Sequence, residues 1–237
     1  MSGHIMDNLE AVRARIAAAC TQAGRPLESV RLLAVSKTYG PEAVQAAAAA
    51  GQVIFGENRV QEAAAKIPAC PGHLQWHLIG HLQRNKAALA AQLFDWVHSV
   101  DSLKLLEALD RHAGEAGRRL EVLVQVNVSG ERAKSGLAPN EVLAVLARSN
   151  ELTNVQVRGL MTIPPLTEDP EKARPHFRAL RDYRDQWAAE LGMDLDELSM
   201  GMTHDLEVAI AEGATVVRVG TGIFGQRVYP AKGTDPA

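Results

Sequence analysis

Two kinds of segment alternate along this chain. Short apolar runs bounded by polar residues or glycine are typical of strands buried on both faces of a parallel sheet. The longer segments between them place apolar residues at the spacing that marks one face of a helix. The predicted strands are residues 32–35, 52–58, 74–80, 94–100, 120–128, 155–161, 197–201 and 215–220, and the predicted helices are residues 7–23, 41–50, 59–66, 87–91, 103–116, 139–149, 171–191 and 205–212.

Eight strands that alternate with helices predict a parallel (β/α)8 TIM barrel, as one domain over residues 1–237 with an extra N-terminal helix. An open doubly wound sheet is the competing arrangement. It usually has fewer strands and often carries a glycine fingerprint after the first one. Here the first strand leads into Ser36, Lys37 and Thr38 instead, so the barrel is favoured.

Composition narrows the class of protein. The 237 residues are 46% hydrophobic, enough for one sizeable core, and the formal charge of -3 gives no basic footprint for nucleic acid. No apolar run approaches the roughly 20 residues of a membrane span, and the N-terminus lacks the apolar core of a signal peptide. Cys20 and Cys70 have no metal-ligand spacing and the histidines form no HExxH pair, so we expect reduced thiols, no metal site and a cytoplasmic location.

Lys37 stands at the carboxyl end of the first predicted strand, the end where barrels assemble their chemistry. An amine held there partly out of water is a candidate Schiff-base nucleophile. Lysines are usually exposed, so a solvated lysine in a strand-to-helix loop is the alternative.

Glycine-rich turns follow the last two predicted strands. Gly220 and Gly222 allow close approach of a ligand, and backbone N–H groups beside the Thr221 hydroxyl would cradle a phosphate. The segment 199–205 adds small and hydroxylated residues at a helix start. Barrels commonly hold phosphate at these two loops. The alternative is two ordinary turns with Thr203 as a helix N-cap.

Arg218 lies at the end of the eighth predicted strand, where an inward side chain is partly buried. A buried arginine needs acceptors because it keeps its charge. The acceptor is either a carboxylate such as Glu57 or a ring nitrogen of a bound heterocycle. A lysine for an aldehyde, a phosphate cradle and an arginine for a ring nitrogen together describe pyridoxal 5′-phosphate (PLP).

Other polar residues near the strand ends are less specific. Asn58 and Asn127 are candidates for binding ligand oxygens, though either could close a loop. We interpret His77 as a core histidine bonded to backbone and assign no catalytic base to His81 or His204. Tyr39 is the tyrosine near Lys37 that could act as a second acid.

Long motifs resemble the YggS/PROSC family of pyridoxal phosphate homeostasis proteins over nearly the whole chain. Leu78 and Thr203 depart from the usual family residues, and Thr203 keeps a hydroxyl. The matching segments are AVSKT (34–38), FGENRVQE (55–62), WHLIGHLQRNK (76–86), HSVDS (98–102), QVNVSGERAKSG (125–136), RGLMTIPP (158–165), LSMGMTHDLEVAI (198–210) and VVRVGTGIFGQR (216–227).

The resemblance implies a barrel similar to the N-terminal domain of alanine racemase. It implies that Lys37 carries PLP as an internal aldimine and that Arg218 faces the pyridine nitrogen. The cofactor-binding set expected from it also contains Asn58 near the ring and, around the phosphate, Ser199, Gly201, Thr203, Gly220 and Thr221.

The resemblance implies a PLP carrier in vitamin B6 and amino-acid homeostasis, so we expect a protein that exchanges PLP with apo-enzymes and has no efficient turnover. We also expect a monomer, because nothing in the sequence indicates an interface. Racemisation needs proton delivery on both faces of the substrate, and we expect no second domain to supply it, because the chain ends at Ala237. A low-efficiency PLP-dependent racemase or lyase is the alternative. A third possibility is a barrel for another phosphorylated metabolite, with Lys37 as an ion-pair donor.

Overall fold

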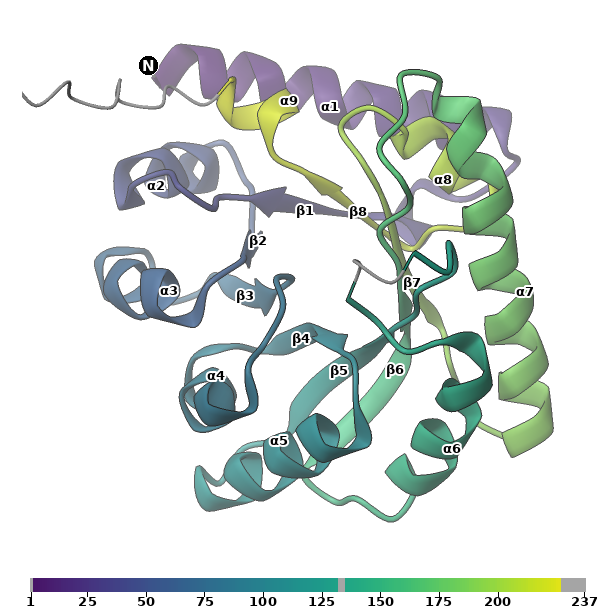
Figure 1. Cartoon of the computed structure of the whole chain (residues 1–237). Helices are drawn as coiled ribbons and strands as arrows, with labels where there is room; N and C mark the ends of the chain where they lie inside the picture. The colour runs from purple at the N-terminus through teal and green to yellow at the C-terminus, as the bar shows by residue number, and fades with distance from the viewer. Residues whose placement is uncertain (1, 132–134, 227–237) are drawn as a thin grey trace, which may run out of the picture.

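The predicted barrel is confirmed. The structure is a computed structural model that describes residues 2–131 and 135–226. Eight parallel strands form a closed barrel in chain order, and β1 pairs with both β2 and β8 (Figure 1). The strands are β1 (Arg31–Val35), β2 (Ile54–Glu57), β3 (Gln75–Leu78), β4 (Trp96–Val100), β5 (Leu120–Gln125), β6 (Val155–Met161), β7 (Glu197–Met202) and β8 (Val216–Val219).

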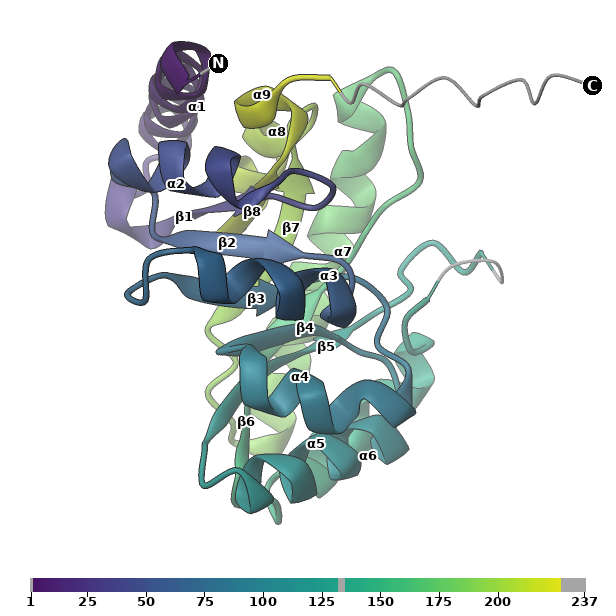
Figure 2. The same cartoon turned by 90° about the vertical axis from the view of Figure 1, so that its left-hand side faces the viewer.

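Helices cover the outside of the barrel, and Figure 2 shows α2 to α5 stacked along the outer side of the first strands. None of the helices in the described part of the chain is long and apolar enough to cross a membrane. The helices are α1 (Ser2–Gln22), α2 (Pro41–Ala49), α3 (Val60–Lys66), α4 (Ala87–Leu93), α5 (Leu103–Glu115), α6 (Pro139–Ser149), α7 (Arg174–Leu191), α8 (Leu206–Ala211) and α9 (Thr221–Phe224), with short 3-10 turns η1 (Leu27–Ser29), η2 (Ile67–Ala69), η3 (Arg84–Lys86) and η4 (Pro170–Ala173).

Some predicted bounds were wrong for local reasons. The long helix begins at Arg174 rather than at residue 171, because the preceding four residues form the 3-10 turn η4, which starts with Pro170. The fifth strand ends at Gln125 rather than at residue 128, and Val126 makes an isolated bridge to Leu137. Two of the recognised motifs include residues 132–134 and 227, which lie outside the described residues.

The strand period of two separates two apolar layers. Ala34 of β1 belongs to the large cluster between strands and helices, whereas its neighbours Leu33 and Val35 belong to a small separate cluster with Ile79 and Val216. Successive side chains of a strand point to opposite faces. The small cluster is therefore the apolar part of the barrel interior, and residues in step with it also point inward.

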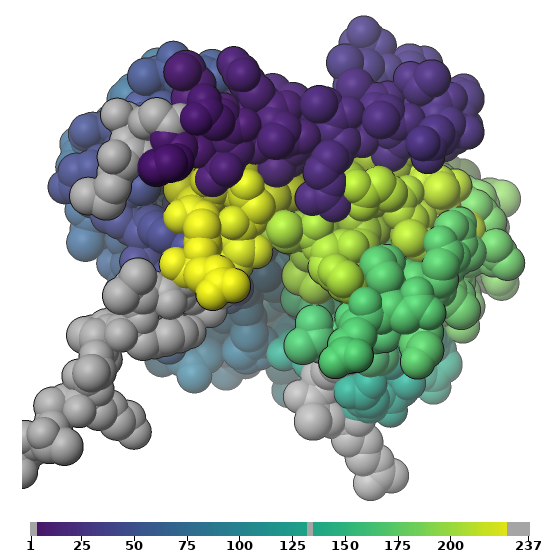
Figure 3. Space-filling model, turned by 90° about the horizontal axis from the view of Figure 1, so that it is seen from above, coloured from purple at the N-terminus to yellow at the C-terminus, as the bar shows by residue number. Residues whose placement is uncertain are grey.

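Helix α1 lies across α8 and α9 on the outside of the barrel (Figures 1 and 3). Its buried Leu9, Val12 and Ile16 form the apolar face that the sequence predicted. Each such side chain contributes roughly 1.5–3 kcal/mol when fully buried. The Asn8 side chain also donates a hydrogen bond of 2.9 Å to the carbonyl of Ile223. The first helix thus fixes the segment that follows β8.

Glu212 connects the end of α8 to α7. Its carboxylate accepts hydrogen bonds from Arg174 at 2.9 Å, Arg178 at 3.0 Å and Arg181 at 3.0 Å. Burial raises the pKa of Glu212, but the hydrogen bonds from the arginines outweigh burial, so its pKa lies below the ordinary value. The ionised carboxylate therefore stabilises the contact between the two helices.

We expect Glu212→Gln to lower the free energy of unfolding by about 2 kcal/mol at neutral pH, because three guanidinium groups lose a charged acceptor. Denaturant titration measures the loss, with Glu190→Gln at an exposed position of α7 as the matched control. A carboxylate with a lowered folded-state pKa stabilises above its unfolded pKa and loses that effect as the pH falls through the folded value. The difference between wild type and Glu212→Gln should therefore close in acid, and a difference that persists there contradicts this role.

Candidate functional site at the barrel mouth

A cavity of about 730 Å³ opens at the carboxyl ends of the strands. Its lining comes from the ends of β1, β7 and β8 and from the loops after β2, β3, β5 and β6. Of the predicted cofactor-binding residues it contains Lys37, Asn58, Thr203, Arg218, Gly220 and Thr221. The structure brings these six residues to one site, while Ser199 and Gly201 lie outside the lining.

Lys37 reaches the mouth from a tight turn after β1. It is in step with Leu33 and Val35, the residues of β1 that point inward, and it is half-buried. The next residue, Thr38, has a φ of 71°, which is rare for a β-branched side chain and costs about 1–3 kcal/mol. The fold thus holds Lys37 at the mouth in a strained turn, as functional sites often do.

A buried polar network holds the turn from its outer side. The Lys66 ammonium donates hydrogen bonds of 2.6 Å to Glu57 Oε1 and 2.8 Å to the carbonyl of Ser36. The Ser36 hydroxyl donates to the same carboxylate oxygen at 2.6 Å. Because Ser36 precedes Lys37, the ion pair fixes the backbone that carries the lysine. It also means that Glu57 pairs with Lys66 and not with Arg218.

Arg218 is in step with Val216 of β8, so its side chain enters the barrel interior, where it is 4% exposed. Its guanidinium donates to the Ser199 hydroxyl at 2.7 Å and to the Thr162 carbonyl at 2.8 Å. Burial lowers the pKa of Arg218 to about 10, and the charge of Asp205 opposes that shift from a distance. Arg218 is therefore a cation at neutral pH, held by neutral acceptors, and it lines the cavity.

The two glycine turns meet beside Arg218. The Thr221 hydroxyl donates to the Thr203 hydroxyl at 3.3 Å, and the Gly222 N–H donates to the same oxygen at 3.4 Å. Gly201 has a φ of 89°, and a Cβ there would lie 2.5 Å from the Cβ of Ala209. Gly201 thus allows β7 to pass close to α8 and deliver Thr203, although it does not itself face the cavity.

The asparagines differ in role. Asn58 lines the cavity, and its backbone packs so closely on Gly80 that a Cβ on Gly80 would lie 2.2 Å from the Asn58 carbonyl oxygen. Asn127 instead closes its own loop, because its side chain donates to the Glu131 carbonyl at 2.9 Å and accepts from the Gly130 N–H at 3.1 Å.

The histidines also differ in location, because His77 is buried whereas His81 and His204 line the cavity. His77 is buried as expected, but the predicted backbone partner was wrong, because its Nδ1 pairs with His98 Nε2 at 2.9 Å. His81 and His204 line the cavity. His81 Nδ1 lies 3.0 Å from Asp101 Oδ2, and His204 Nε2 lies 2.8 Å from the Glu168 carbonyl. The strand period of two, applied to β3 and β4, would have placed His77 and His98 in the interior.

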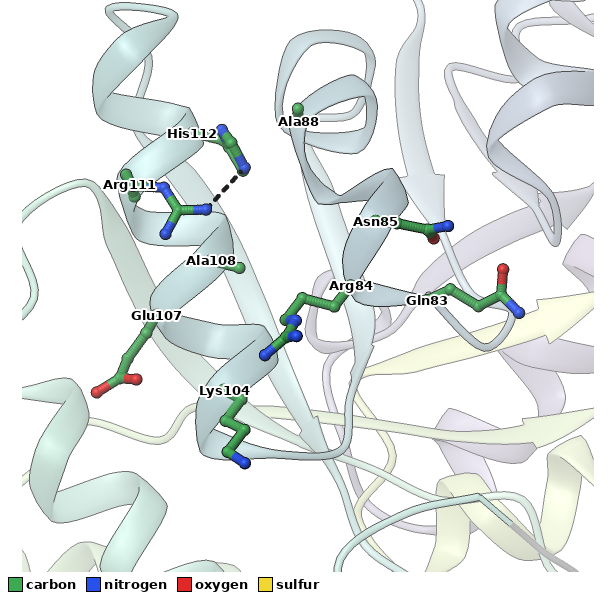
Figure 4. Close-up of a pocket in the computed structure, with 9 residues that line it drawn as sticks. All are labelled: Gln83, Arg84, Asn85, Ala88, Lys104, Glu107, Ala108, Arg111 and His112. Atoms are coloured by element: carbon green, nitrogen blue, oxygen red, sulfur yellow. Dashed lines mark hydrogen bonds between the residues drawn. The ribbon is translucent and has the colours of Figure 1, made fainter.

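A second cavity of about 910 Å³ opens on the outer wall between α4 and α5 (Figure 4). The exposed side chains of Arg84, Lys104 and Arg111 border it, and Glu107 points away from it in the view of Figure 4. It shares no lining residue with the mouth cavity and contains none of the predicted site residues. The chemistry predicted for this chain therefore belongs to the mouth.

Comparison with known proteins agrees with the fold. The alanine racemase N-terminal domain family matches residues 8–228. Alanine racemase of Clostridium difficile 630 superposes with a TM-score of 0.75 at 15% identity, covering 97% of this chain and 58% of that one. The fold and the mouth site thus define a barrel of the alanine racemase N-terminal domain class.

Nearer relatives identify the family. The chain is 44% identical over 224 residues to the pyridoxal phosphate homeostasis protein of Aquifex aeolicus, covering 94% of this chain and 98% of that protein. It is 46% identical over 230 residues to that of Pseudomonas aeruginosa, with 96% and 97% covered. PipY of Synechococcus elongatus PCC7942, solved with PLP bound, has a TM-score of 0.82 at 42% identity and covers 93% of this chain and 100% of its own. The chain belongs to the family of pyridoxal phosphate homeostasis proteins.

We expect Lys66→Met to lower the free energy of unfolding by roughly 3–5 kcal/mol, because the Glu57 carboxylate stays buried without its cation. The double variant Lys66→Met/Glu57→Leu should recover part of that loss, since both charges are then absent. Denaturant titration measures both, with Lys104→Met at an exposed position as the control. A double variant whose loss equals the sum of the single losses contradicts a coupled pair.

Proposed function

We propose that this protein binds PLP covalently through Lys37 and serves intracellular PLP and amino-acid homeostasis without efficient turnover. The family membership and the PLP-bound structure of PipY support the ligand. The observation that carries the proposal is Arg218, a buried cation that lines the same cavity as Lys37. Among the described residues, none of its hydrogen-bond partners is a carboxylate. Because a guanidinium can only donate hydrogen bonds, Arg218 favours a ligand that offers an acceptor.

The residues at the mouth suit each part of PLP. Lys37 provides the amine for the aldehyde, and Arg218 can donate to the pyridine nitrogen. Thr203, Gly220 and Thr221 offer hydroxyl and backbone donors to a phosphate where α9 begins, and Asn58 lies on the wall between these groups and β3. We propose that Ser199 and Gly201 act from behind this surface, by holding Arg218 and shaping the turn after β7. When bound, PLP supplies an electrophilic carbon and an electron-accepting ring.

Two features support a carrier rather than an efficient enzyme. An arginine at the pyridine nitrogen disfavours ring protonation and so weakens the electron-accepting capacity of the ring. Tyr39, the candidate second acid, donates its hydroxyl to the Gly225 carbonyl at 2.8 Å and is not part of the cavity lining. We further propose a cytoplasmic monomer with one domain that exchanges PLP with apo-enzymes, in keeping with the unpaired Cys20 and Cys70.

His81 supports the second candidate function, a low-efficiency PLP-dependent racemase or lyase. It lines the cavity, and the Asp101 carboxylate at 3.0 Å orients its ring as a carboxylate orients a general base. His81 is exposed to solvent and stands on the loop after β3.

Loading with PLP, borohydride reduction and mass spectrometry of peptides should locate the pyridoxyl group on Lys37. The Lys37→Ala variant should lose both this adduct and the visible absorbance of the bound cofactor, whereas Lys104→Ala, an exposed lysine outside the mouth, should keep both. An adduct on another lysine, with Lys37 unmodified, contradicts the assignment.

In deuterium oxide, single amino acids incubated with the PLP-loaded protein should exchange their α-protons no faster than with free PLP, because the ring nitrogen stays unprotonated. Proton NMR follows the exchange. Faster exchange that falls in His81→Gln would instead establish the racemase or lyase.

A further inference from the structure

A chain of buried polar side chains runs through the barrel interior behind Arg218. The Ser199 hydroxyl lies 2.9 Å from His98 Nδ1, and His98 Nε2 lies 2.9 Å from His77 Nδ1. With Arg218 the chain contains four residues, each at most 4% exposed. They come from β3, β4, β7 and β8, so the contacts span the barrel.

The two histidines in this hydrogen-bond chain, His77 and His98, are neutral. Burial, followed by the charge of Arg31, lowers the pKa of His77 to about 3. Burial is the main cause that holds the pKa of His98 well below its ordinary value. Electrostatic interactions with three neighbours lower it further, namely His77, Arg218 and Arg31. Each imidazole therefore carries a single N–H, and each contact in the chain has one defined donor.

Arg218 sets the direction of the chain because a guanidinium can only donate. Ser199 accepts from Arg218 and has one proton to donate to His98 Nδ1. His98 is then protonated on Nε2 and donates to His77 Nδ1, and the remaining N–H lies on His77 Nε2, which is the fully buried side-chain atom of these four residues that has no hydrogen-bond partner among the described residues. The reverse direction would leave two buried groups unpaired, the serine proton and His77 Nε2, so it is disfavoured.

Aromatic contacts fix His77, the last residue of the hydrogen-bond chain. The ring of His77 stacks on Trp96 with 5.5 Å between centroids and 17° between planes, and the Arg31 guanidinium lies 5.3 Å from the centroid of the Trp96 ring. These contacts fix the ring of His77 without a carboxylate. Along its whole length the chain thus offers Arg218 an oriented acceptor with no negative charge.

We infer that His77, His98 and Ser199 form a one-way hydrogen-bond relay that positions the Arg218 guanidinium and leaves its full charge directed into the mouth cavity. The inference deepens the proposed function and rests on it for the ligand. A carboxylate behind Arg218 would neutralise the charge and favour protonation of a ligand ring nitrogen. The neutral relay holds the guanidinium through the Ser199 hydroxyl without neutralising it, and so keeps that nitrogen unprotonated. His77 and His98 act through Ser199 and Arg218, and they are positioning residues.

The direction of the relay is tested without PLP. Nitrogen-15 NMR of histidine-labelled protein, assigned with His77→Gln and His98→Gln, should show both residues as neutral Nε2–H tautomers between about pH 5 and pH 8. A solvent-exposed histidine changes its charge within this range, because its pKa is about 6.5. A His98 protonated on Nδ1, or either histidine charged in this range, overturns the relay.

The effect on the ligand is tested by PLP titration followed by absorbance. Ser199→Ala should weaken PLP binding about tenfold and shift the pH dependence of the bound absorbance toward easier ring protonation, because Arg218 loses an acceptor. His98→Leu should do the same more weakly. Ser149→Ala, which removes a buried hydroxyl bonded to the Leu146 carbonyl on α6, should change neither.

A double-variant cycle separates positioning from folding. In an Arg218→Met background, Ser199→Ala should have no further effect on affinity or on the absorbance profile. Equal effects in both backgrounds, or lower stability with binding unchanged, overturn the inference. A wild-type protein that yields no pyridoxyl adduct contradicts the proposed function instead, and the tautomers then decide the relay alone.

Discussion

The site depends on one constraint: the Arg218 guanidinium stays charged inside the barrel, although no carboxylate in the described part of the chain accepts a hydrogen bond from it. Burial of an ion is costly, and proteins usually offset the cost with a counter-ion. Here Arg218 has a hydroxyl and a carbonyl as its partners, and Asp205, whose charge raises the pKa of Arg218, is not one of its hydrogen-bond partners. The remaining positive potential points into the cavity, so the cavity is suited to a ligand that brings an acceptor.

Lys37 and Arg218 are supported on opposite faces of the barrel wall. Lys37 is fixed from outside, where Lys66 and Glu57 hold the carbonyl and hydroxyl of Ser36. Arg218 is fixed from inside by Ser199 and the histidines behind it. The wall itself separates an ion pair that neutralises charge from a relay that does not. These contacts fix the positions of the amine and the guanidinium relative to each other at the wall of the mouth cavity.

The fold could be predicted from the sequence because short apolar runs and amphipathic helical segments alternate regularly along the chain. The positions of Lys37 and Arg218 at the mouth could be predicted because both stand near the carboxyl ends of strands, and these ends share one rim in any parallel barrel. The hydrogen-bond partners of buried polar residues were harder to predict. Glu57 was considered as a partner for Arg218, yet it is in step with Phe55, which packs in the outer layer, so it faces α3. The single-residue alternation of a strand holds that information.

Contacts between distant strands could not be predicted in the same way. The bond between His98 and Ser199 joins residues 101 positions apart, and nothing local in either segment signals the other. The positive φ of Thr38 is equally hidden, because the residue type argues against it. The contact between His98 and Ser199 depends on closure of the barrel, which brings β4 and β7 across one interior.

The claim that Arg218 leaves the pyridine nitrogen unprotonated is tested most directly by nitrogen-15 NMR of protein loaded with PLP labelled at that nitrogen. The account predicts a chemical shift of an unprotonated nitrogen that accepts a hydrogen bond, and a change in that shift when Arg218 is replaced by methionine. A pyridinium shift in the wild-type protein would contradict it.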